Sequence, residues 1–427
     1  MFYLIHFLPL LTFVLLFVGS GVYFSLQGVG NAFYQLSPLV AIIPSIALGW
    51  VLYKGKTQER MNAFLNGMRH PDIITMCIIF LLAGAFSQLT NAIGSVNATV
   101  NFALYVIPAH FLIMGIFLIA AFISTAIGTS MGTIATIAPL AVGMSVQADF
   151  SLPLVMATVV GGAMFGDSLS VISDTTIAAV MSQEADMRKK LVVNAKVALI
   201  AALCTLAVLF YSAQTGSTVV SGQYSWLLVS PYLLLLALAF LGVNVFTVLG
   251  TSIFFAGAVG FFTNPDQGLL FISKNMAAGF ASMHEIMVLS LLVGGLSGLA
   301  GQGVSTLATK LSSWIKNHGG KKTAQFCIAG IVSIFDLLLA NNTIAIIFSG
   351  EIARDIAKKN NIPAHYSAAW LDIFSCVFQG IIPYGAQILL ASAIAGVSPL
   401  SIVPHVYFCY LLAAVAVAHI FLKRTVV

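Results

Sequence analysis

The sequence predicts an all-α polytopic membrane protein with about ten spans, two re-entrant hairpins and two inverted repeats that contain interrupted helices. Of its 427 residues, 59% are hydrophobic and only 7% are charged, whereas a soluble domain carries about 25% charged residues. Apolar runs of about 20 residues, long enough to cross a hydrocarbon core, recur along the whole chain. These runs are continuous rather than alternating, which favours membrane helices over a β-barrel.

The charge and cysteine patterns exclude several function classes. The net charge of +5 comes from basic residues in short loops, so it does not indicate nucleic-acid binding. The five cysteines are scattered through apolar runs without the spacing of metal ligands. Residues 128–132, GTSMG, match a hydrolase nucleophile pattern but lie between apolar helical runs, where that motif does not function. We therefore expect a protein that is not an enzyme, needs no cofactor and has the lipid bilayer as its main partner.

Ten apolar segments are predicted to be spans. No basic residue precedes Lys54, so the first segment lacks the basic region of a secretory signal and is expected to be retained. The predicted spans are 4–24, 36–53, 73–93, 153–180, 192–212, 225–242, 243–262, 285–308, 367–395 and 402–421.

Basic residues predict the orientation, because short cytoplasmic loops collect lysine and arginine. Five clusters should therefore be cytoplasmic, which places both termini on the inner side of a bacterial cytoplasmic membrane. The clusters are Lys54/Lys56/Arg60/Arg69, Arg188/Lys189/Lys190/Lys196, Lys310/Lys316/Lys321/Lys322, Arg354/Lys358/Lys359 and Lys423/Arg424.

Two further apolar stretches are predicted to be hairpins. Segment 323–353 starts and ends beside cytoplasmic clusters, yet its roughly 31 residues are too few for two spans of about 20 residues each. A re-entrant hairpin with Asn341, Asn342 and Thr343 at its tip is the simplest solution, and such a tip must be covered by protein or line a water-filled cavity. Segment 102–147 is broken at Thr129 and Ser130 and forms either a second hairpin or two spans.

The order of elements predicts a repeat. Residues 1–212 and residues 213–427 each contain three spans, a hairpin and two spans. Span 73–93 should run from inside to outside, whereas span 285–308 should run in the opposite direction. Inverted repeats with interrupted helices near the bilayer midplane are typical of secondary transporters.

One span in each repeat is interrupted by polar or helix-breaking residues. The first contains GDSLSVISDTT at 166–176, and the second contains LDIFSCVFQGIIPYGAQ at 371–387. Proline in a helix interior, as at Pro383, frees a backbone carbonyl, and freed carbonyls are suitable ligands for hard cations.

Four carboxylates lie deep in these predicted segments, namely Asp167, Asp174, Asp336 and Asp372. Each costs roughly 2.5–3.5 kcal/mol at the bilayer centre on insertion scales. Apart from Lys196, near the start of span 192–212, no lysine or arginine falls inside the predicted spans, so these acids should be protonated, bound to a cation or in contact with water. The pattern favours a proton and cation site, while helix capping by the aspartates and asparagines, and a structural role for Asp336, stay open as alternatives.

The interrupted segments resemble those of the NhaC family of sodium/proton antiporters. FGDSLSVISDTT is similar to that family's Gly-Asp-Lys-Leu-Ser-Pro-Leu-Ser-Asp-Thr-Thr signature, and LLLANNTIAIIFSG and LDIFSCVFQGIIPYGAQILLA are similar to its second-half counterparts. The resemblance implies exchange of Na+ for H+, with Asp167 and Asp174 as the sodium-binding carboxylates. The implied ion- or substrate-binding residues are Asp167, Ser170, Ser173, Asp174, Thr175, Thr176, Asn341, Asn342, Thr343, Asp372, Gln379, Pro383 and Tyr384.

The chain departs from the family pattern at three positions. Ser168 replaces a lysine, Val171 a proline and Ile177 an asparagine, and the missing lysine removes a counter-charge. The main hypothesis is an Na+/H+ antiporter that works by alternating access. The alternative is an Na+- or H+-coupled carrier or exchanger of a small organic acid or amino acid. A channel is a more distant alternative, and the sequence also allows a homodimer.

Overall fold

The computed structural model describes eight stretches of the chain, and the regular structure within them is entirely helical. Lys316, Lys423 and Arg424, which belong to predicted cytoplasmic clusters, lie outside the described residues. The described stretches are residues 8–27, 35–106, 108–148, 150–171, 173–213, 223–263, 268–315 and 320–422.

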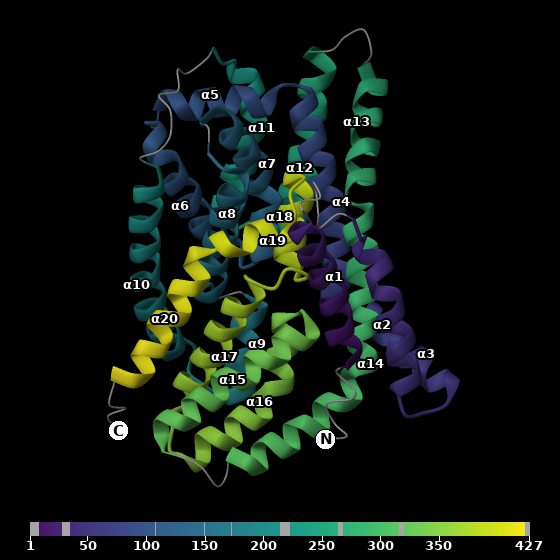
Figure 1. The fold of residues 1–427 in the computed structure, drawn as a ribbon. Coiled ribbons are helices and arrows are strands. Elements are labelled where there is room, and N and C mark those ends of the chain that lie inside the picture. Colours follow the sequence, from purple (N-terminus) through teal and green to yellow (C-terminus); the bar gives the residue numbers. More distant parts are fainter. Residues whose placement is uncertain are drawn as a thin grey trace.

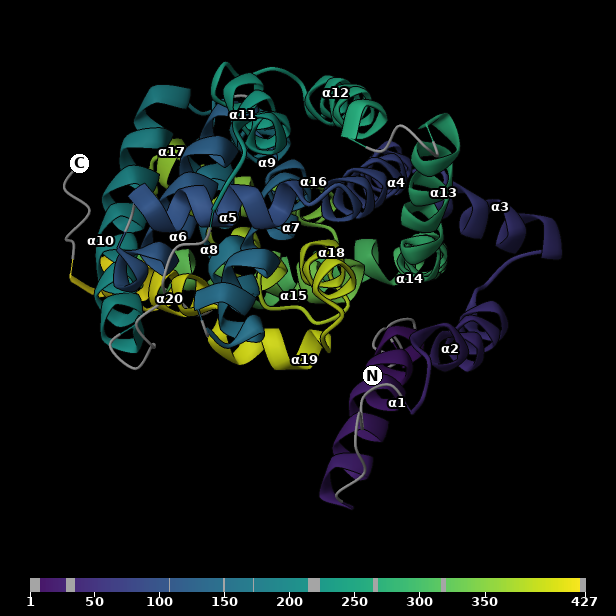
Figure 2. The same cartoon turned by 90° about the horizontal axis from the view of Figure 1, so that it is seen from above.

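The described residues of the first half of the chain form helices α1 to α10 (Figure 1). They are α1 (Leu8–Leu26), α2 (Pro38–Leu52), α3 (Thr57–Met68), α4 (Pro71–Ala92), α5 (Ser95–Val106), α6 (Ala109–Ile127), α7 (Ser130–Ala148), α8 (Leu152–Leu169), α9 (Asp174–Gln183) and α10 (Met187–Ala213). Seen from above, α1, α2 and α3 project on one side of the bundle (Figure 2).

The described residues of the second half form helices α11 to α20. They are α11 (Trp226–Phe240), α12 (Val245–Thr263), α13 (Gly268–Ser282), α14 (His284–Ile315), α15 (Lys321–Leu339), α16 (Asn342–Lys359), α17 (Ala364–Gln379), α18 (Ala386–Ala395), α19 (Pro399–Ile402) and α20 (Tyr407–Leu422).

The fold is that of a polytopic membrane protein. Among the described residues, six helices are long and apolar enough to cross a membrane, or seven if the bent pair of α18 and α19 counts as one span. Several shorter apolar helices accompany them, including α1, α2, α11 and α20. The predicted count of ten spans and the inverted repeats therefore stay predictions.

Two helices of more than ten residues, α3 and α13, lie wholly outside the predicted segments. α3 is an amphipathic helix without a buried residue and packs against α14. α13 packs closely against α4, because a Cβ atom placed on Gly84 would lie 2.3 Å from the carbonyl oxygen of Gly279. Small residues allow such close approach between membrane helices.

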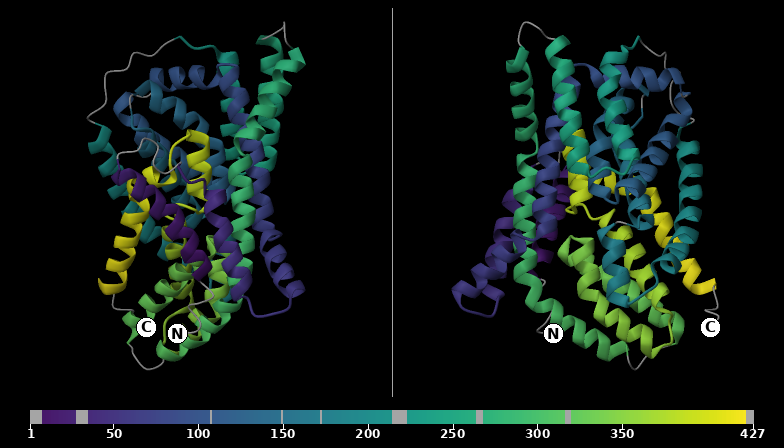
Figure 3. Two further views of the ribbon diagram at one scale, coloured as in Figure 1. Left: turned by 45° about the vertical axis from the view of Figure 1, so that its right-hand side comes forward. Right: turned by 180° about the vertical axis from the view of Figure 1, so that it is seen from behind.

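Several segments that carry basic clusters lie at one end of the molecule. The start of α10 and the ends of α14, α16 and α20 all lie at the lower end in Figure 1 and Figure 3. This arrangement agrees with the rule from which the orientation was predicted.

α8 lies at the centre of the bundle and is fixed against α6. Of the 18 residues of α8, 14 are buried inside the protein. A Cβ atom on Gly166 would lie 2.4 Å from the Cβ atom of Ser124, so only glycine fits at this contact. Ser124 Oγ also donates a hydrogen bond of 2.6 Å to the carbonyl oxygen of Ala163. These contacts fix the position of the next residue, Asp167, relative to α6.

Candidate functional site

A cavity of about 80 Å³ lies where four helix interruptions meet. These are the α6–α7 turn, the α8–α9 break, the α15–α16 turn and the α17–α18 break, with α4 closing one side. The lining residues are Thr75, Met76, Ile79, Gly128, Thr129, Ser130, Met131, Asp167, Ser173, Asp174, Thr175, Ala340, Asn341, Asn342, Thr343, Gln379 and Gln387.

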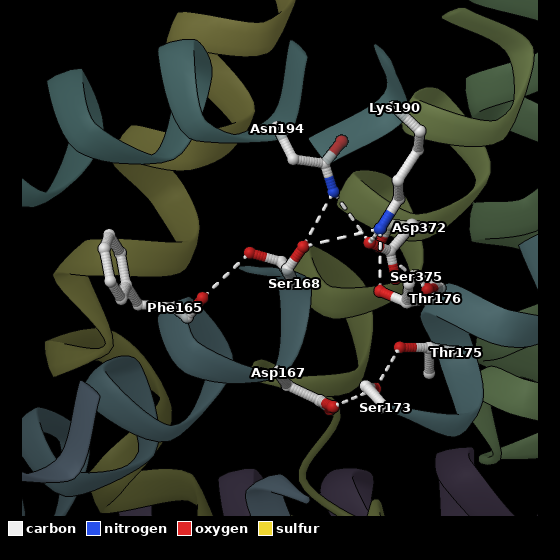
Figure 4. A network of polar contacts seen from close by, with 10 residues as sticks. All are labelled: Phe165, Asp167, Ser168, Ser173, Thr175, Thr176, Lys190, Asn194, Asp372 and Ser375. Atoms are coloured by element: carbon white, nitrogen blue, oxygen red, sulfur yellow. Dashed lines mark hydrogen bonds and ion pairs between the residues drawn. The ribbon is translucent and has the colours of Figure 1, made fainter. Parts of the chain in front are cut away.

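Asp167 is the buried carboxylate of this cavity. Its side chain is 4% exposed. Oδ1 accepts a hydrogen bond of 2.5 Å from Ser173 Oγ, and Oδ2 accepts one of 2.9 Å from Ser130 Oγ (the contact with Ser173 appears in Figure 4). Both partners are neutral hydroxyls, so the carboxylate keeps its negative charge available to a cation or a proton.

The α8–α9 break supplies further oxygen atoms to the cavity. Ser170 and Ser173 are extended, with ψ angles of 134° and 136°, so the helix stops and restarts between them. Ser173 and Thr175 share a hydrogen bond of 2.9 Å between their hydroxyls. Asp174, the first residue of α9, is exposed and lines the cavity. Ser173 precedes α9 but makes no side-chain capping hydrogen bond, because its hydroxyl is directed to Asp167 and Thr175 instead.

The α15–α16 turn forms the opposite wall. Ala340 has a φ of 51°, in the left-handed region, and ends α15. Asn341 caps α16, because its Oδ1 accepts a hydrogen bond of 2.9 Å from the backbone N–H of Ile344. Asn342 Oδ1 accepts a hydrogen bond of 3.0 Å from the backbone of Thr343. The two asparagines therefore cap the turn and line the cavity together with Thr343.

Two glutamines connect this wall to Asp167. Gln379 Nε2 donates to Gln387 Oε1 at 2.7 Å and to the carbonyl oxygen of Ala340 at 3.3 Å. Gln387 Nε2 donates to Ser130 Oγ at 3.2 Å, and Ser130 in turn donates to Asp167. Gln387 was not among the predicted site residues, although it lies in the segment quoted for the second interruption.

Asp372 occupies a different environment, and the expectation that the buried acids lack a basic partner is wrong for it. Its Oδ2 forms an ion pair with Lys190 Nζ, and both side chains are 0% exposed. Asn194 Nδ2 donates a second hydrogen bond of 2.7 Å to the same oxygen (Figure 4). Asp372 does not line the cavity.

Lys190 also holds the α8–α9 break. Its Nζ donates to Thr176 Oγ1 at 2.7 Å and lies 3.5 Å from the carbonyl oxygen of Ser168. Asn194 Nδ2 donates to that carbonyl at 2.9 Å. Thr176 therefore contacts the ion pair and not the cavity, and Lys190 brings positive charge beside Ser168 from another helix.

The spacing of Lys190 and Asn194 could have indicated that both lie on one helix face. The orientation prediction instead placed Lys190 in a cytoplasmic loop. Lys190 was assigned to a cytoplasmic cluster, and the span was predicted to begin at residue 192. In the structure α10 begins at Met187, because Asp186 Oδ1 accepts a hydrogen bond of 2.9 Å from the backbone N–H of Lys189. This hydrogen bond lowers the pKa of Asp186. Residues four apart share one helix face, so Lys190 and Asn194 point together into the protein.

Four other predicted residues lie outside the cavity lining. Ser170 ends α8 and is buried. Pro383 lies in the α17–α18 break, and Tyr384 Oη donates a hydrogen bond of 2.5 Å to the carbonyl oxygen of Leu337. Asp336 is fully buried within α15. The structure therefore brings together most, but not all, of the predicted set.

The chain is similar to two antiporters over most of its length. It is 26% identical to the Na+/H+ antiporter NhaC of Bacillus subtilis, covering 90% of this chain and 91% of that protein. It is 23% identical to the arginine/ornithine antiporter ArcD of Halobacterium salinarum, covering 91% of this chain and 87% of that protein. A shorter match, 30% identical, joins 36% of this chain to 31% of the malate-2H+/Na+-lactate antiporter of Bacillus subtilis.

A family model gives the assignment. Residues 2–215, half of the chain, match the model described as the Na+/H+ antiporter family. The resemblance stated from the interrupted segments is confirmed by this match and by the similarity to NhaC. This multi-pass membrane protein belongs to the Na+/H+ antiporter family.

Proposed function

We propose that this cation/proton antiporter exchanges Na+ for H+, and that the two compete at Asp167 and Asp174. The observation that carries the proposal is the cavity at the four interruptions. There, the hydrogen-bond donors to Asp167 among the described residues are both hydroxyls, and Asp174 stands beside it at the start of α9. Together with the hydroxyls of Ser173 and Thr175, these carboxylates form an oxygen-rich set that suits a hard cation.

Coupling follows from competition for the carboxylates. A carboxylate must release its proton to bind a metal ion, so sodium affinity rises with pH and sodium binding releases protons. Neutral hydroxyl partners support this role, because they leave the negative charge of Asp167 uncompensated until a cation or proton arrives.

The size of the cavity favours a small cargo. A water molecule occupies about 30 Å³ in the liquid, so about 80 Å³ accommodates an ion with a few waters. The amides and hydroxyls of the α15–α16 turn then serve as the opposing wall and as further ligands.

Alternating access is the mechanism we infer for this exchange. The two halves, residues 1–212 and residues 213–427, would act as inverted repeats that rock around the cavity. The presence of one turn and one interrupted helix from each half at the cavity supports this inference. The basic segments at one end would face the cytoplasm of a bacterial cell, with the protein in the inner membrane.

The first test is Asp174→Asn in inverted membrane vesicles or proteoliposomes. We expect this variant to lose pH-dependent Na+ exchange, because a neutral amide neither competes for a proton nor compensates the charge of Na+. Asp186→Asn is the matched control: its carboxylate is exposed at the start of α10, and asparagine also caps helices. Wild-type exchange by Asp174→Asn would contradict the assignment.

A second candidate is an exchanger of a small carboxylate or amino acid, coupled to Na+ or H+. The names of two relatives, an arginine/ornithine antiporter and a malate-2H+/Na+-lactate antiporter, favour it. Asn341, Asn342 and Thr343 at the start of α16 would then bind the substrate carboxylate. Uptake of labelled amino acids and organic acids into proteoliposomes, with and without a sodium gradient, separates the two functions.

A further inference from the structure

Asp336 is a fully buried carboxyl group that the proposed exchange site does not use. It lies in α15, one helical turn before the tip at Ala340, and is 0% exposed. Neither of its carboxylate oxygens has a hydrogen-bond partner among the described residues. Asp167 and Asp372, by contrast, each accept two hydrogen bonds at least.

An ionised carboxylate in such surroundings is strongly unfavourable, because no side chain or ion pair among the described residues replaces the water that it has lost. A proton removes the charge and also turns the group into a hydrogen-bond donor. The environment of Asp336 in this conformation therefore suits a neutral carboxylic acid and not a carboxylate.

Few titratable or charged groups face Asp336 from the packed helices. Tyr384 is close enough to interact with it electrostatically, and its hydroxyl donates to the carbonyl of the neighbouring Leu337. On α17, the nearest acidic residue to Gln379 is Asp372, about two helical turns away. Asp372 is neutralised by its ion pair with Lys190. The first two turns of α16, residues 342–348, contain no charged residue.

Gln379 links Asp336 to the cavity. Its backbone lies near the Asp336 carboxyl, and its side chain lines the cavity and donates to Gln387. The other side-chain atom, Gln379 Oε1, is buried and has no hydrogen-bond partner among the described residues. Asp336 and Gln379 are thus two buried polar side chains with atoms that lack partners among the described residues, and a protonated Asp336 is a hydrogen-bond donor.

We propose that Asp336 is a second proton-binding site of the transporter, separate from the carboxylates that face the cation. It holds a proton in the conformation seen here. Its release requires water or a positive partner to reach the carboxyl, which a displacement of the α15–α16 hairpin relative to α17 would allow. This inference rests on the proposed Na+/H+ exchange and adds to it a proton that moves with the second-half hairpin.

The direct test is the coupling ratio of Asp336→Asn in proteoliposomes. Sodium flux is measured against imposed sodium, proton and potassium–valinomycin gradients until net flux vanishes. We expect the number of protons exchanged per sodium ion to fall by one in Asp336→Asn, with sodium exchange retained and less dependent on pH. Asp186→Asn should keep the wild-type ratio. An unchanged ratio and pH profile in Asp336→Asn would mean that the carboxyl is a permanently protonated structural group.

A second measurement covers the case in which Asp336→Asn does not transport. Infrared difference spectra of the purified full-length protein, recorded between low and high pH, report the C=O band of a carboxylic acid. We expect the wild type to show a pH-sensitive band that is absent from Asp336→Asn and present in Asp186→Asn. If Asp336→Asn kept every pH-sensitive C=O band of the wild type, the proposal would be overturned. Because this readout needs no sodium exchange, failure of the proposed function and failure of the proton site are distinguishable.

Discussion

The aspartates of the two interrupted helices, α8–α9 and α17–α18, have different partners. Asp167, near the end of α8, faces the cavity and accepts hydrogen bonds from the neutral hydroxyls of Ser130 and Ser173. Asp372, in α17, is sealed from the cavity and paired with Lys190. The two residues correspond in the sequence pattern, yet Asp167 has two hydroxyl partners at the cavity whereas Asp372 has a fixed, positively charged partner.

This difference suits the two breaks to different roles. A carboxylate held by neutral donors attracts whichever cation enters the cavity, whereas one held by a buried ammonium group cannot be removed from its partner without leaving an uncompensated charge. The α8–α9 break is therefore suited to ion exchange, and the Asp372–Lys190 pair is suited to joining α10 and α17 around it.

The largest expected effect comes from neutralising the exchangeable carboxylate. Asp167→Asn should reduce sodium affinity by up to about 1000-fold, since two unit charges about 4 Å apart interact by about 4 kcal/mol at an effective dielectric of about 20. Thermal stability in detergent should change little, because asparagine keeps one oxygen acceptor for the hydroxyl donors. Sodium binding measured by calorimetry checks this, and a tenfold loss or less would place the ion elsewhere.

For Asp372, loss of its partner Lys190 should lower the free energy of unfolding. Lys190→Met leaves Asp372 buried without its partner, and breaking one side of a buried pair costs about 3–5 kcal/mol. The double variant Lys190→Met/Asp372→Leu should recover much of that loss, because apolar residues of similar size replace buried pairs well. Unfolding of the three proteins in detergent gives the comparison. A single variant as stable as the wild type would show that the pair does not hold the helices together.

Much of the fold followed from the sequence because its causes are local. Continuous apolar runs predict membrane helices, and the glycine, proline and hydroxyl clusters predicted the interruptions near residues 170 and 383. α13 was not predicted, because Lys274 and Asn275 interrupt its apolar run. The structure pairs it with α4 through Gly84 and Gly279.

The partners of the carboxylates did not follow from the sequence, because they depend on tertiary packing. Lys190 lies next to Arg188 and Lys189, which are exposed, and the residue pattern assigns all three to one loop. Only the position of the first turn of α10 against α17 decides that Lys190 alone points inward. Gln387 was missed for a similar reason, since its role depends on its hydrogen bond to Ser130 in the other half.

The α6–α7 turn and the α15–α16 turn, which meet at the cavity, differ in one residue that affects stability. Gly128 ends α6 with a φ of 77°, and Ala340 ends α15 with a φ of 51°. Each backbone N–H donates a hydrogen bond of 2.8 Å to the carbonyl four residues earlier. The backbone is therefore alike in both, but only the first turn has the residue that adopts a positive φ without steric cost.

Exchanging these residues should move stability in opposite directions. Gly128→Ala should destabilise the protein by roughly 1–2 kcal/mol, because the Cβ atom is unfavourable in the left-handed region. Ala340→Gly relieves the same strain but adds freedom to the unfolded chain, so a gain of about 0.5 kcal/mol is expected. Unfolding midpoints in detergent measure both changes. Equal losses in the two variants would mean that Ala340 makes a packing contact worth more than its strain, and would make the second turn a rigid wall and not a strained tip that can move.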